Sequence, residues 1–370
     1  MKRHPIDPLF LWLLIGLTVF GLVMLLSASG PTGLQKFHSN WFFFKNQLLH
    51  GLLPGVCAFL VLSYIDYRYL RQLALAALIA SIILLVLVFI PGLGLHLGGA
   101  GRWVQIGPIA FQPSEFVKVT FILYTAGWLA SSVQRDVRSK NITQGLLPFI
   151  CVLGTVVALL ALQPNTGSTM VIAGSALCMY LIAGAPLIWF ACLSVLGVAG
   201  LWFLIHVTPY RAARFMTFLH PELDPLGVGY HINQSFLAIG SGGPFGLGYG
   251  HSRQKYLFLP EVTGDSIFAI MGEELGFLLT CVFIFILGWF VFRIFKIGRD
   301  APDDFGRYIC VGIGSWIGIQ GFFNMGSMLG LVPITGVTLP FVSYGSSAFL
   351  ALAIGMGLVA SVSRASRIHS

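Results

Sequence analysis

The sequence is poor in charged residues. Only 9% of its 370 residues are charged, against about 25% in a typical soluble domain, and 56% are hydrophobic. This composition excludes a soluble globular protein. It excludes disorder as well, because 31 phenylalanines and 8 tryptophans carry too much apolar surface to remain solvated. We therefore expect an all-α polytopic membrane protein.

The sequence also lacks a cysteine framework and a basic tract. Its six cysteines all lie inside apolar runs, so we interpret them as buried thiols without disulfide or metal-ligand spacing. The net charge of +8 could indicate nucleic-acid binding, but the cations occur singly and in pairs between hydrophobic segments. This pattern is typical of membrane topology rather than of phosphate contacts, and we expect no nucleic-acid partner.

Long apolar segments are abundant. Windows long enough to cross a bilayer with modest tilt lie near residues 8–29, 46–65, 72–91, 111–133, 144–163, 167–184, 187–206, 266–295, 306–329 and 340–363. About ten spans would place both termini on one side of the membrane. We expect residues 1–370 to form a single membrane domain, whose first window is a retained helix rather than a cleaved signal peptide.

Positive charge favours one side of this topology. The side that holds the termini collects thirteen cations: Lys2, Arg3, Arg68, Arg71, Arg135, Arg138, Lys140, Arg293, Lys296, Arg299, Arg307, Arg364 and Arg367. The short loops of the other side hold three, Lys36, Lys45 and Arg102. Because cytoplasmic loops carry the excess of lysine and arginine, both termini are expected to be cytoplasmic.

One long loop, residues 207–265 between the seventh and eighth windows, is then extracellular. It carries Glu222, Asp224, Glu261 and Asp265 among many glycines and aromatic residues. Loops of this length are usually functional or disordered, and this one is too apolar for disorder. We expect short amphipathic helices that lie on or dip into the outer leaflet.

A pair of opposite charges occurs inside the fourth window. Glu115 and Lys118 are three residues apart, so they share a helix face and can pair. Charges within a membrane are costly and often functional. Two interpretations stay open: an ion pair that only stabilises the inserted helix, or a polar wall of an internal cavity. Gln112 and Ser114, which precede the pair, favour the second.

Asp265 lies where the long loop meets the eighth window. A carboxylate edged by apolar residues is partly desolvated, and its pKa can rise toward the range of a general base. Its position equally suits a helix N-cap. Glu273 and Glu274 lie more than two helical turns further along, and at least one of them should be buried with a polar partner. Glu261 is interpreted as a loop ligand or hydrogen-bond acceptor.

Two further stretches can contribute to a binding site. The glycine-rich segment 239–250 either forms tight turns or exposes backbone amides to an anion such as pyrophosphate. The segment 333–349 is either a helix break or a polar rim of an external cavity. The resulting candidates for substrate or pyrophosphate binding are Arg102, Lys255, Arg211, Arg214, Gln234, Ser343 and Ser347.

Six motifs then occur in order along the chain: GRWVQIG, FQPSEFVK, QPNTGS, DPLGVGYHINQSFLAIGSGGPFGLGYG, QKYLFLPEVTGDSIFAIMGEELG and LVPITGVTLPFVSYGSS. Together they resemble the SEDS family of shape, elongation, division and sporulation proteins over nearly the whole chain. Gln254 and Lys255 before the LPE triplet, with the TGVTLPFVSYG ending, look more similar to the FtsW division branch than to the RodA branch.

The resemblance implies a ten-helix glycosyltransferase that polymerises lipid II into glycan strands at the outer face of the cytoplasmic membrane. It implies a class B penicillin-binding protein as transpeptidase partner, with other division or elongation proteins, and enrichment at the division septum. Asp265 takes the position of the essential loop aspartate of the family, and Glu115 with Lys118 that of its intramembrane pair. A divalent cation, magnesium or manganese, is a candidate cofactor, and no nucleotide is expected.

The chain departs from the family pattern at several positions. Gly264 and Ser266 stand in TGDSIFA where the family usually reads HTDFIFA, Asn165 replaces the aspartate of QPD, and Ser346 replaces a glycine of SYGGS. Two other functions remain as alternatives: a lipid II flippase, with a headgroup path past Glu115 and Lys118, and a non-catalytic scaffold for division partners.

Overall fold

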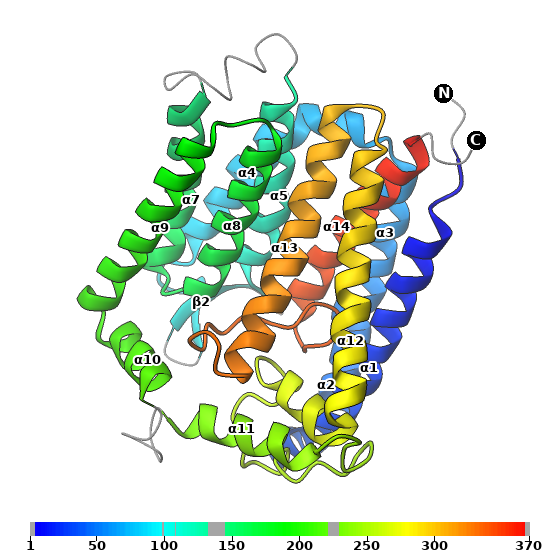
Figure 1. The fold of residues 1–370 in the computed structure, drawn as a ribbon, viewed down its shortest axis with the longest axis vertical. Coiled ribbons are helices and arrows are strands. Elements are labelled where there is room, and N and C mark those ends of the chain that lie inside the picture. The colour runs from blue at the N-terminus through cyan, green and yellow to red at the C-terminus, as the bar shows by residue number, and fades with distance from the viewer. Residues whose placement is uncertain (1–3, 98–99, 108, 132–144, 221–228, 367–370) are drawn as a thin grey trace.

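The computed structural model describes residues 4–97, 100–107, 109–131, 145–220 and 229–366. They form a bundle of long helices with connecting segments at both ends (Figure 1). Six helical stretches among the described residues are long and apolar enough to cross a membrane: α1 (Pro8–Phe37), the continuous run α2–η1–α3 (Phe42–Asn46, Gln47–Leu52 and Leu53–Tyr64), α4 (Tyr67–Leu87), α9 (Leu187–Val207), α12 (Ile267–Arg299) and α14 (Ser346–Ala365).

The remaining apolar windows also contain helices: α5 (Pro113–Leu129), α7 (Leu147–Leu162), α8 (Thr166–Ile182) and α13 (Asp304–Met328). α7 and α8 are apolar but shorter than the six candidate spans. The chain is therefore a multi-pass helical membrane protein, and the count of ten spans stays a prediction.

Several helices begin where a side chain can accept from the first free backbone amides. Asp7 accepts from the amide of Phe10 at 2.8 Å, and Asn165 from that of Ser168 at 3.2 Å. Proline stands at the first position of α5, where its missing amide proton costs nothing. These local signals explain why the apolar windows become helices with defined starts.

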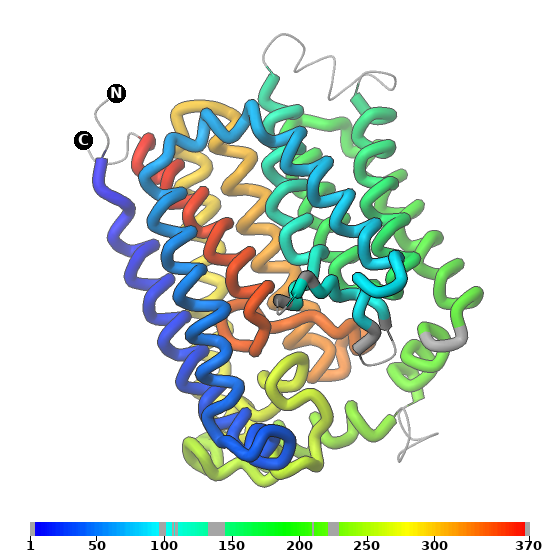
Figure 2. The backbone as a smooth tube through the Cα atoms, turned by 180° about the vertical axis from the view of Figure 1, so that it is seen from behind, coloured from blue at the N-terminus to red at the C-terminus, as the bar shows by residue number. Residues whose placement is uncertain are grey.

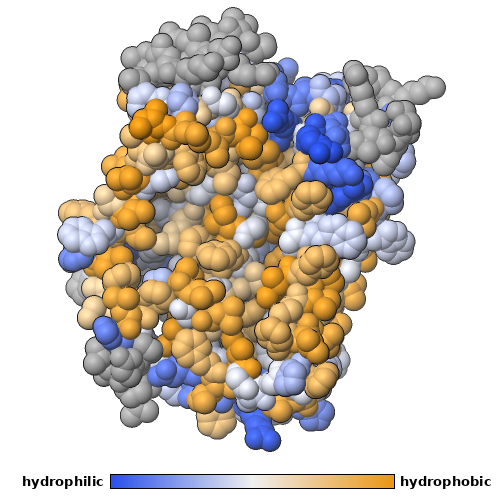
Figure 3. Space-filling view, viewed as in Figure 1, coloured by the Kyte–Doolittle hydropathy of each residue, from blue (hydrophilic) through white to orange (hydrophobic). Residues whose placement is uncertain are grey.

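The centre of the bundle is formed by α13 and α14. Trp316 of α13 and Met356 of α14 are almost fully enclosed, whereas none of the residues of α9 is buried. α9 thus lies at the periphery, and its apolar side chains face outward. Figure 3 shows apolar residues covering much of one side of the molecule, with hydrophilic residues gathered toward its ends.

The expectation of an all-α protein is wrong in one place. Between α4 and α5 the chain forms a three-stranded antiparallel sheet, β1 (Gly94–Leu97), β2 (Ala100–Ile106) and β3 (Ile109–Phe111). Alternate residues of β2 face opposite sides, so that Val104 is buried and Gln105 is exposed. The segment is too short and too rich in glycine for a spanning helix, and its aromatic and β-branched residues favour strands.

The two ends of the bundle differ. The described ends of the chain lie together, where the amide of His4 donates to the carbonyl of Arg364 at 3.1 Å. At the opposite end lie α10 (Pro209–Leu219), α11 (Tyr230–Gly242) and the loop that leads to α12 (Figures 1 and 2). The expectation of short helices in the long loop is confirmed, although Glu222 and Asp224 lie outside the described residues.

Candidate functional site

The turn that carries Asp265 closes on itself. The backbone amides of Gly264 and Ser266 both donate to the carbonyl of Glu261, at 3.0 and 3.2 Å. α12 begins at Ile267, with Ser266 as its N-cap and with no side-chain capping bond. The interpretation of Asp265 as an N-cap is therefore wrong, and its carboxyl group does not serve to begin the helix.

Two arginines lie near the Asp265 carboxyl group. A Cβ atom placed on Gly336 would lie 3.4 Å from Oδ2 of Asp265 and 3.9 Å from Nη1 of both Arg102 and Arg214. The backbone of Gly336 thus lies among three charged groups that come from β2, from α10 and from the turn before α12. Arg102 also donates to the carbonyl of Pro164, which helps to fix its guanidinium group.

The surroundings of Asp265 change its proton affinity. Burial and the nearby carboxylate of Glu261 raise the pKa of Asp265, the positive charges of Arg214 and Arg102 lower it, and the result is a pKa of about 7. Burial has the larger effect, because the free energy of hydration that the ionised carboxylate loses exceeds the favourable electrostatic interaction with the two guanidinium groups. The carboxyl group can therefore exchange a proton near neutral pH, as a general base must.

Side chains from distant segments fix the backbone of this turn. Asn324 of α13 donates from Nδ2 to the carbonyl of Asp265 at 2.9 Å and to that of Val337 at 2.7 Å. The hydroxyl group of Ser343 donates to the carbonyl of Gly264 at 2.6 Å. Ser343 thus contacts the backbone of the turn rather than the carboxyl group of Asp265. Asn324 is absent from the sequence-based candidates, and its only signal is an amide side chain inside an apolar helix.

Glu115 and Lys118 form the ion pair that their spacing predicts. The ammonium group of Lys118 donates to both carboxyl oxygens of Glu115, at 2.8 and 2.9 Å, and to Oε1 of Gln320 at 2.8 Å. It also lies 5.5 Å from the ring centroid of Trp316. Gln320 in turn donates to the carbonyl of Thr338 at 2.9 Å. This buried network joins α5 to α13 and to the segment before α14.

The space around the pair is narrow. A cavity bordered by Gln320, Thr338 and Ser343 has room for roughly one water molecule. A second, tighter cavity lies beside Lys118 and Ser175. The pair therefore lies in closely packed protein, without a wide channel at either of these two places.

The other predicted residues of this region join helix ends. The hydroxyl group of Ser347 accepts from the backbone amide of Gln112 at 3.2 Å. Ser114 accepts from Nδ2 of Asn165 at 3.0 Å. These contacts tie the start of α5 to the starts of α14 and α8. Asn165, one of the departures from the family pattern, thus has a structural partner as a neutral amide.

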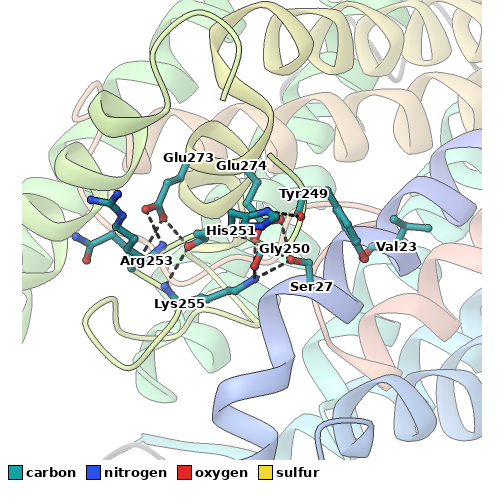
Figure 4. A network of polar contacts seen from close by, with 11 residues as sticks. Val23, Ser27, Tyr249, Gly250, His251, Arg253, Lys255, Glu273 and Glu274 are labelled. Carbon is teal, nitrogen blue, oxygen red and sulfur yellow. Dashed lines mark hydrogen bonds and ion pairs between the residues drawn. The ribbon is translucent and has the colours of Figure 1, made fainter. Parts of the chain in front are cut away.

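Lys255 lies in a separate cluster rather than beside Asp265. Its ammonium group donates to Glu274 Oε1 at 2.8 Å, to the hydroxyl group of Ser27 at 3.0 Å and to the carbonyl of Gly250 at 2.8 Å (Figure 4). All three protons of the ammonium group are used in these bonds. The structure therefore does not bring Lys255 to the predicted pyrophosphate site, because Glu274 and Ser27 hold it elsewhere.

Both buried glutamates of α12 have polar partners, as expected for at least one of them. Glu273 accepts from the backbone amide of Arg253 (Figure 4). It also accepts from the hydroxyl group of Ser252 and from the backbone amide of Gln254. Together with Glu274 it anchors the preceding loop to α12. A carboxylate that accepts several amide protons is well satisfied when buried.

Two further candidates lie on α10 and α11. The guanidinium group of Arg211 donates to Thr166 Oγ1 at 3.2 Å, to Thr208 Oγ1 at 3.0 Å and to the carbonyl of Ala161 at 2.8 Å. These bonds make it a link between α10 and the connection from α7 to α8. Gln234 is half-buried on α11.

The glycine-rich segment packs against α12. Its amides at Leu247 and Gly248 donate to the carbonyls of Glu273 and Glu274, at 2.9 and 3.0 Å. A Cβ atom on Gly246 would lie 2.2 Å from the carbonyl oxygen of Glu274, so only glycine permits this approach. At these positions the amides bind α12, which favours the packing interpretation over anion binding.

A divalent cation stays a prediction. Among the residues that the structure describes, no three histidine, cysteine, aspartate or glutamate side chains are grouped so that they could hold a metal ion. The carboxyl group of Asp265 instead faces the guanidinium groups of Arg102 and Arg214. We therefore assign no step to a metal ion.

Known proteins resemble this chain over almost its full length. Stage V sporulation protein E of Bacillus subtilis is 37% identical over 99% of both chains. A probable peptidoglycan glycosyltransferase FtsW of Trichlorobacter lovleyi is 38% identical over 96% of this chain and 93% of the relative.

Solved structures share the fold. The rod shape determining protein RodA of Thermus thermophilus superposes with a TM-score of 0.72 at 26% identity, over 98% of both chains. A chain from a structure described as the coordination of polymerization and crosslinking by a peptidoglycan synthase complex gives 0.77 at 26% identity, over 97% of this chain and 98% of that chain. The model of the FtsW, RodA and SpoVE family, described as "Cell cycle protein", matches residues 8–368. The chain therefore belongs to the FtsW/RodA/SpoVE family.

Proposed function

We propose that the chain is a peptidoglycan glycosyltransferase that polymerises lipid II into glycan strands. The observation that carries the proposal is the Asp265 carboxyl group, with its pKa near neutrality, beside the two guanidinium groups of Arg102 and Arg214. The relatives named peptidoglycan glycosyltransferase, which cover almost the whole chain, support the same activity.

Asp265 acts as the general base in this proposal. Its carboxylate takes the proton from the C4 hydroxyl group of the acceptor sugar as that oxygen attacks C1 of the donor sugar. The new C1–O4 bond forms while the bond from C1 to the polyprenyl pyrophosphate breaks. The proton stays on Asp265, and the electron pair leaves with the pyrophosphate. General-base catalysis of this kind contributes about 10²–10⁴ in rate.

Arg102 and Arg214 stabilise the leaving group. The pyrophosphate gains negative charge as it departs, and preorganised cations lower the free energy of that transition state. Arg102 reaches the site from the sheet and Arg214 from α10, so the substrate would lie between these elements and Gly336. The structural role of Asn324 and Ser343 is to hold the base opposite these cations.

The energy source, the location and the partner of the reaction follow from the same proposal. The carbon–oxygen bond to pyrophosphate supplies the driving force, so no nucleotide is needed, and the reaction belongs at the outer face of the cytoplasmic membrane. A class B penicillin-binding protein is the proposed partner, which would cross-link the strands. The structural neighbour described as part of a peptidoglycan synthase complex supports a partner of this kind. Enrichment at the division septum is also proposed.

The experiment is polymerisation by the purified chain. Detergent-solubilised protein is incubated with lipid II, with and without a divalent cation, and glycan strands are resolved by gel electrophoresis. Strands should form with this chain as the sole protein. A flippase would instead move fluorescent lipid II across proteoliposomes without making strands, and a scaffold would do neither, so either outcome would contradict the proposal.

A further inference from the structure

The residue after Asp265 has two hydrogen-bond partners. The hydroxyl oxygen of Ser266 lies 2.6 Å from the carbonyl oxygen of Pro260 and 2.6 Å from Nε2 of His231 on α11. A carbonyl oxygen can only accept, so the single hydroxyl proton of Ser266 points to Pro260. The hydroxyl oxygen must then accept the proton that His231 carries on Nε2.

This donor keeps a fixed form near neutral pH. Burial and the positive charge of Arg214 lower the pKa of His231 to about 4. The ring is therefore neutral, with its proton on Nε2 and a lone pair on Nδ1. A neutral ring supplies a hydrogen bond to Ser266 without adding a positive charge beside Asp265.

The contact with His231 is the third that holds the turn of residues 261–266, which carries Asp265. Asn324 of α13 holds the carbonyl of Asp265, and Ser343 holds that of Gly264. We propose that His231 is a positioning residue for Asp265, which ties α11 to the turn through Ser266 and keeps the turn closed around the carboxyl group. The inference rests on the proposed role of Asp265 as the base.

The contact depends on the hydroxyl group at position 266, because only a side chain that both donates and accepts can join His231 to the carbonyl of Pro260. In this chain the serine hydroxyl group accepts from His231 and also donates to Pro260. Ser266 thus links α11 to the turn that carries the base.

The hydrogen bond between His231 and Ser266 should affect the pKa of Asp265, because it controls how much water reaches the carboxyl group. The charged groups that act on this carboxyl group are Glu261, Arg214 and Arg102, and burial is the largest influence. If the turn loosens, water reaches the carboxylate and its pKa falls toward the ordinary value. Loss of the His231 bond should then move the acid limb of the rate profile to lower pH and slow the reaction.

The test compares two substitutions in the lipid II polymerisation assay. His231→Leu removes the donor, whereas His231→Gln keeps an N–H donor at a similar reach. We expect His231→Leu to lower kcat by roughly ten- to hundredfold and to shift the acid limb of the profile to lower pH. His231→Gln should recover most of the rate and the wild-type limb. An unshifted limb in His231→Leu would overturn the inference.

Ser266→Ala gives the second arm. It removes the acceptor together with the hydrogen bond that the hydroxyl group donates to the carbonyl of Pro260, but it removes no capping bond, because the Ser266 side chain caps nothing. We expect the same shift of the acid limb, and no further shift in the double variant with His231→Leu. Independent effects that add in the double variant would contradict the link. If Asp265→Asn keeps its activity, the proposed function fails; if only the histidine variants resemble wild type, this inference fails alone.

Discussion

At the scale of single residues, the behaviour of Asp265 follows from opposing influences on one carboxyl group. Burial and Glu261 raise its pKa, and Arg102 and Arg214 lower it. Burial has the largest effect, and the resulting pKa is about 7. A base must be ionised to accept a proton, so the rate should fall as the pH drops below about 7. The pH dependence of kcat/KM with lipid II would measure this. A flat profile between pH 5.5 and 8 would contradict it.

The pair Glu115 and Lys118 supports a second prediction at this scale. Glu115→Gln leaves a buried ammonium group without its counter-charge, which costs about 3–5 kcal/mol. Glu115→Gln combined with Lys118→Met removes both charges and should recover most of the lost thermal stability, measured by the melting temperature in detergent. Activity should stay low, because Gln320 loses the hydrogen bond from Lys118 and keeps only that from the indole N–H of Trp316 on its side-chain oxygen. Recovery of both stability and activity would make the pair purely structural.

At the scale of elements, the loop before α12 depends on close contact between backbones. A Cβ atom on Gly276 would lie 2.2 Å from the amide nitrogen of Gly246, and Gly276 adopts a φ of 75° inside α12. Gly276→Ala should therefore displace the loop and lower both the melting temperature and the polymerisation rate.

Gly288 provides the matched control on the same helix. No atom lies within 4 Å of a Cβ placed there, so Gly288→Ala should leave the rate and the melting temperature near wild type, or raise the melting temperature slightly through better helix propensity. Equal losses in the two variants would contradict the role of the close contact.

The helices could be predicted from the sequence more fully than their connections. Apolar windows and capping residues such as Asp7 and Asn165 are local signals, and helices occur in every predicted window. The sequence does not predict the sheet that carries Arg102, because its strands are short and a sheet requires pairing between segments. Its hydrogen-bond register, for example Val104 opposite Phe111, is fixed only in the folded chain.

The candidate site shows the same limit. Asp265 can be found from its place between a polar loop and an apolar window. The hydrogen-bond partners of Lys118 and Asp265 cannot be found from the sequence, because they are far along the chain. Gln320 is 202 positions from Lys118, and Asn324 is 59 positions from Asp265. Lys255 is a candidate that the sequence suggests and the fold does not support. Its charge suggests anion binding, but in the folded chain it forms an ion pair with Glu274.

At the scale of the whole molecule, the distribution of cations predicts which end of the bundle faces the cytoplasm. Arg253, in the loop before α12, and Arg299, the last residue of α12, are both exposed. The loop before α12 and the far end of that helix lie at opposite ends of the bundle (Figure 1). In a cysteine-free background, Arg253→Cys should react with a membrane-impermeant thiol reagent in intact spheroplasts and Arg299→Cys should not. The inverse labelling would reverse the topology and place Asp265 in the cytoplasm.

The most direct test of the central claim is the polymerisation rate of Asp265→Asn. Asparagine has nearly the same shape, and Asp265 holds its neighbours through its backbone carbonyl, so the variant should fold with wild-type size-exclusion behaviour. Without a base, the rate with lipid II should fall by about 10²–10⁴. A folded Asp265→Asn protein whose rate stays within about threefold of wild type, well inside that range, would contradict the assignment of Asp265 as the catalytic base.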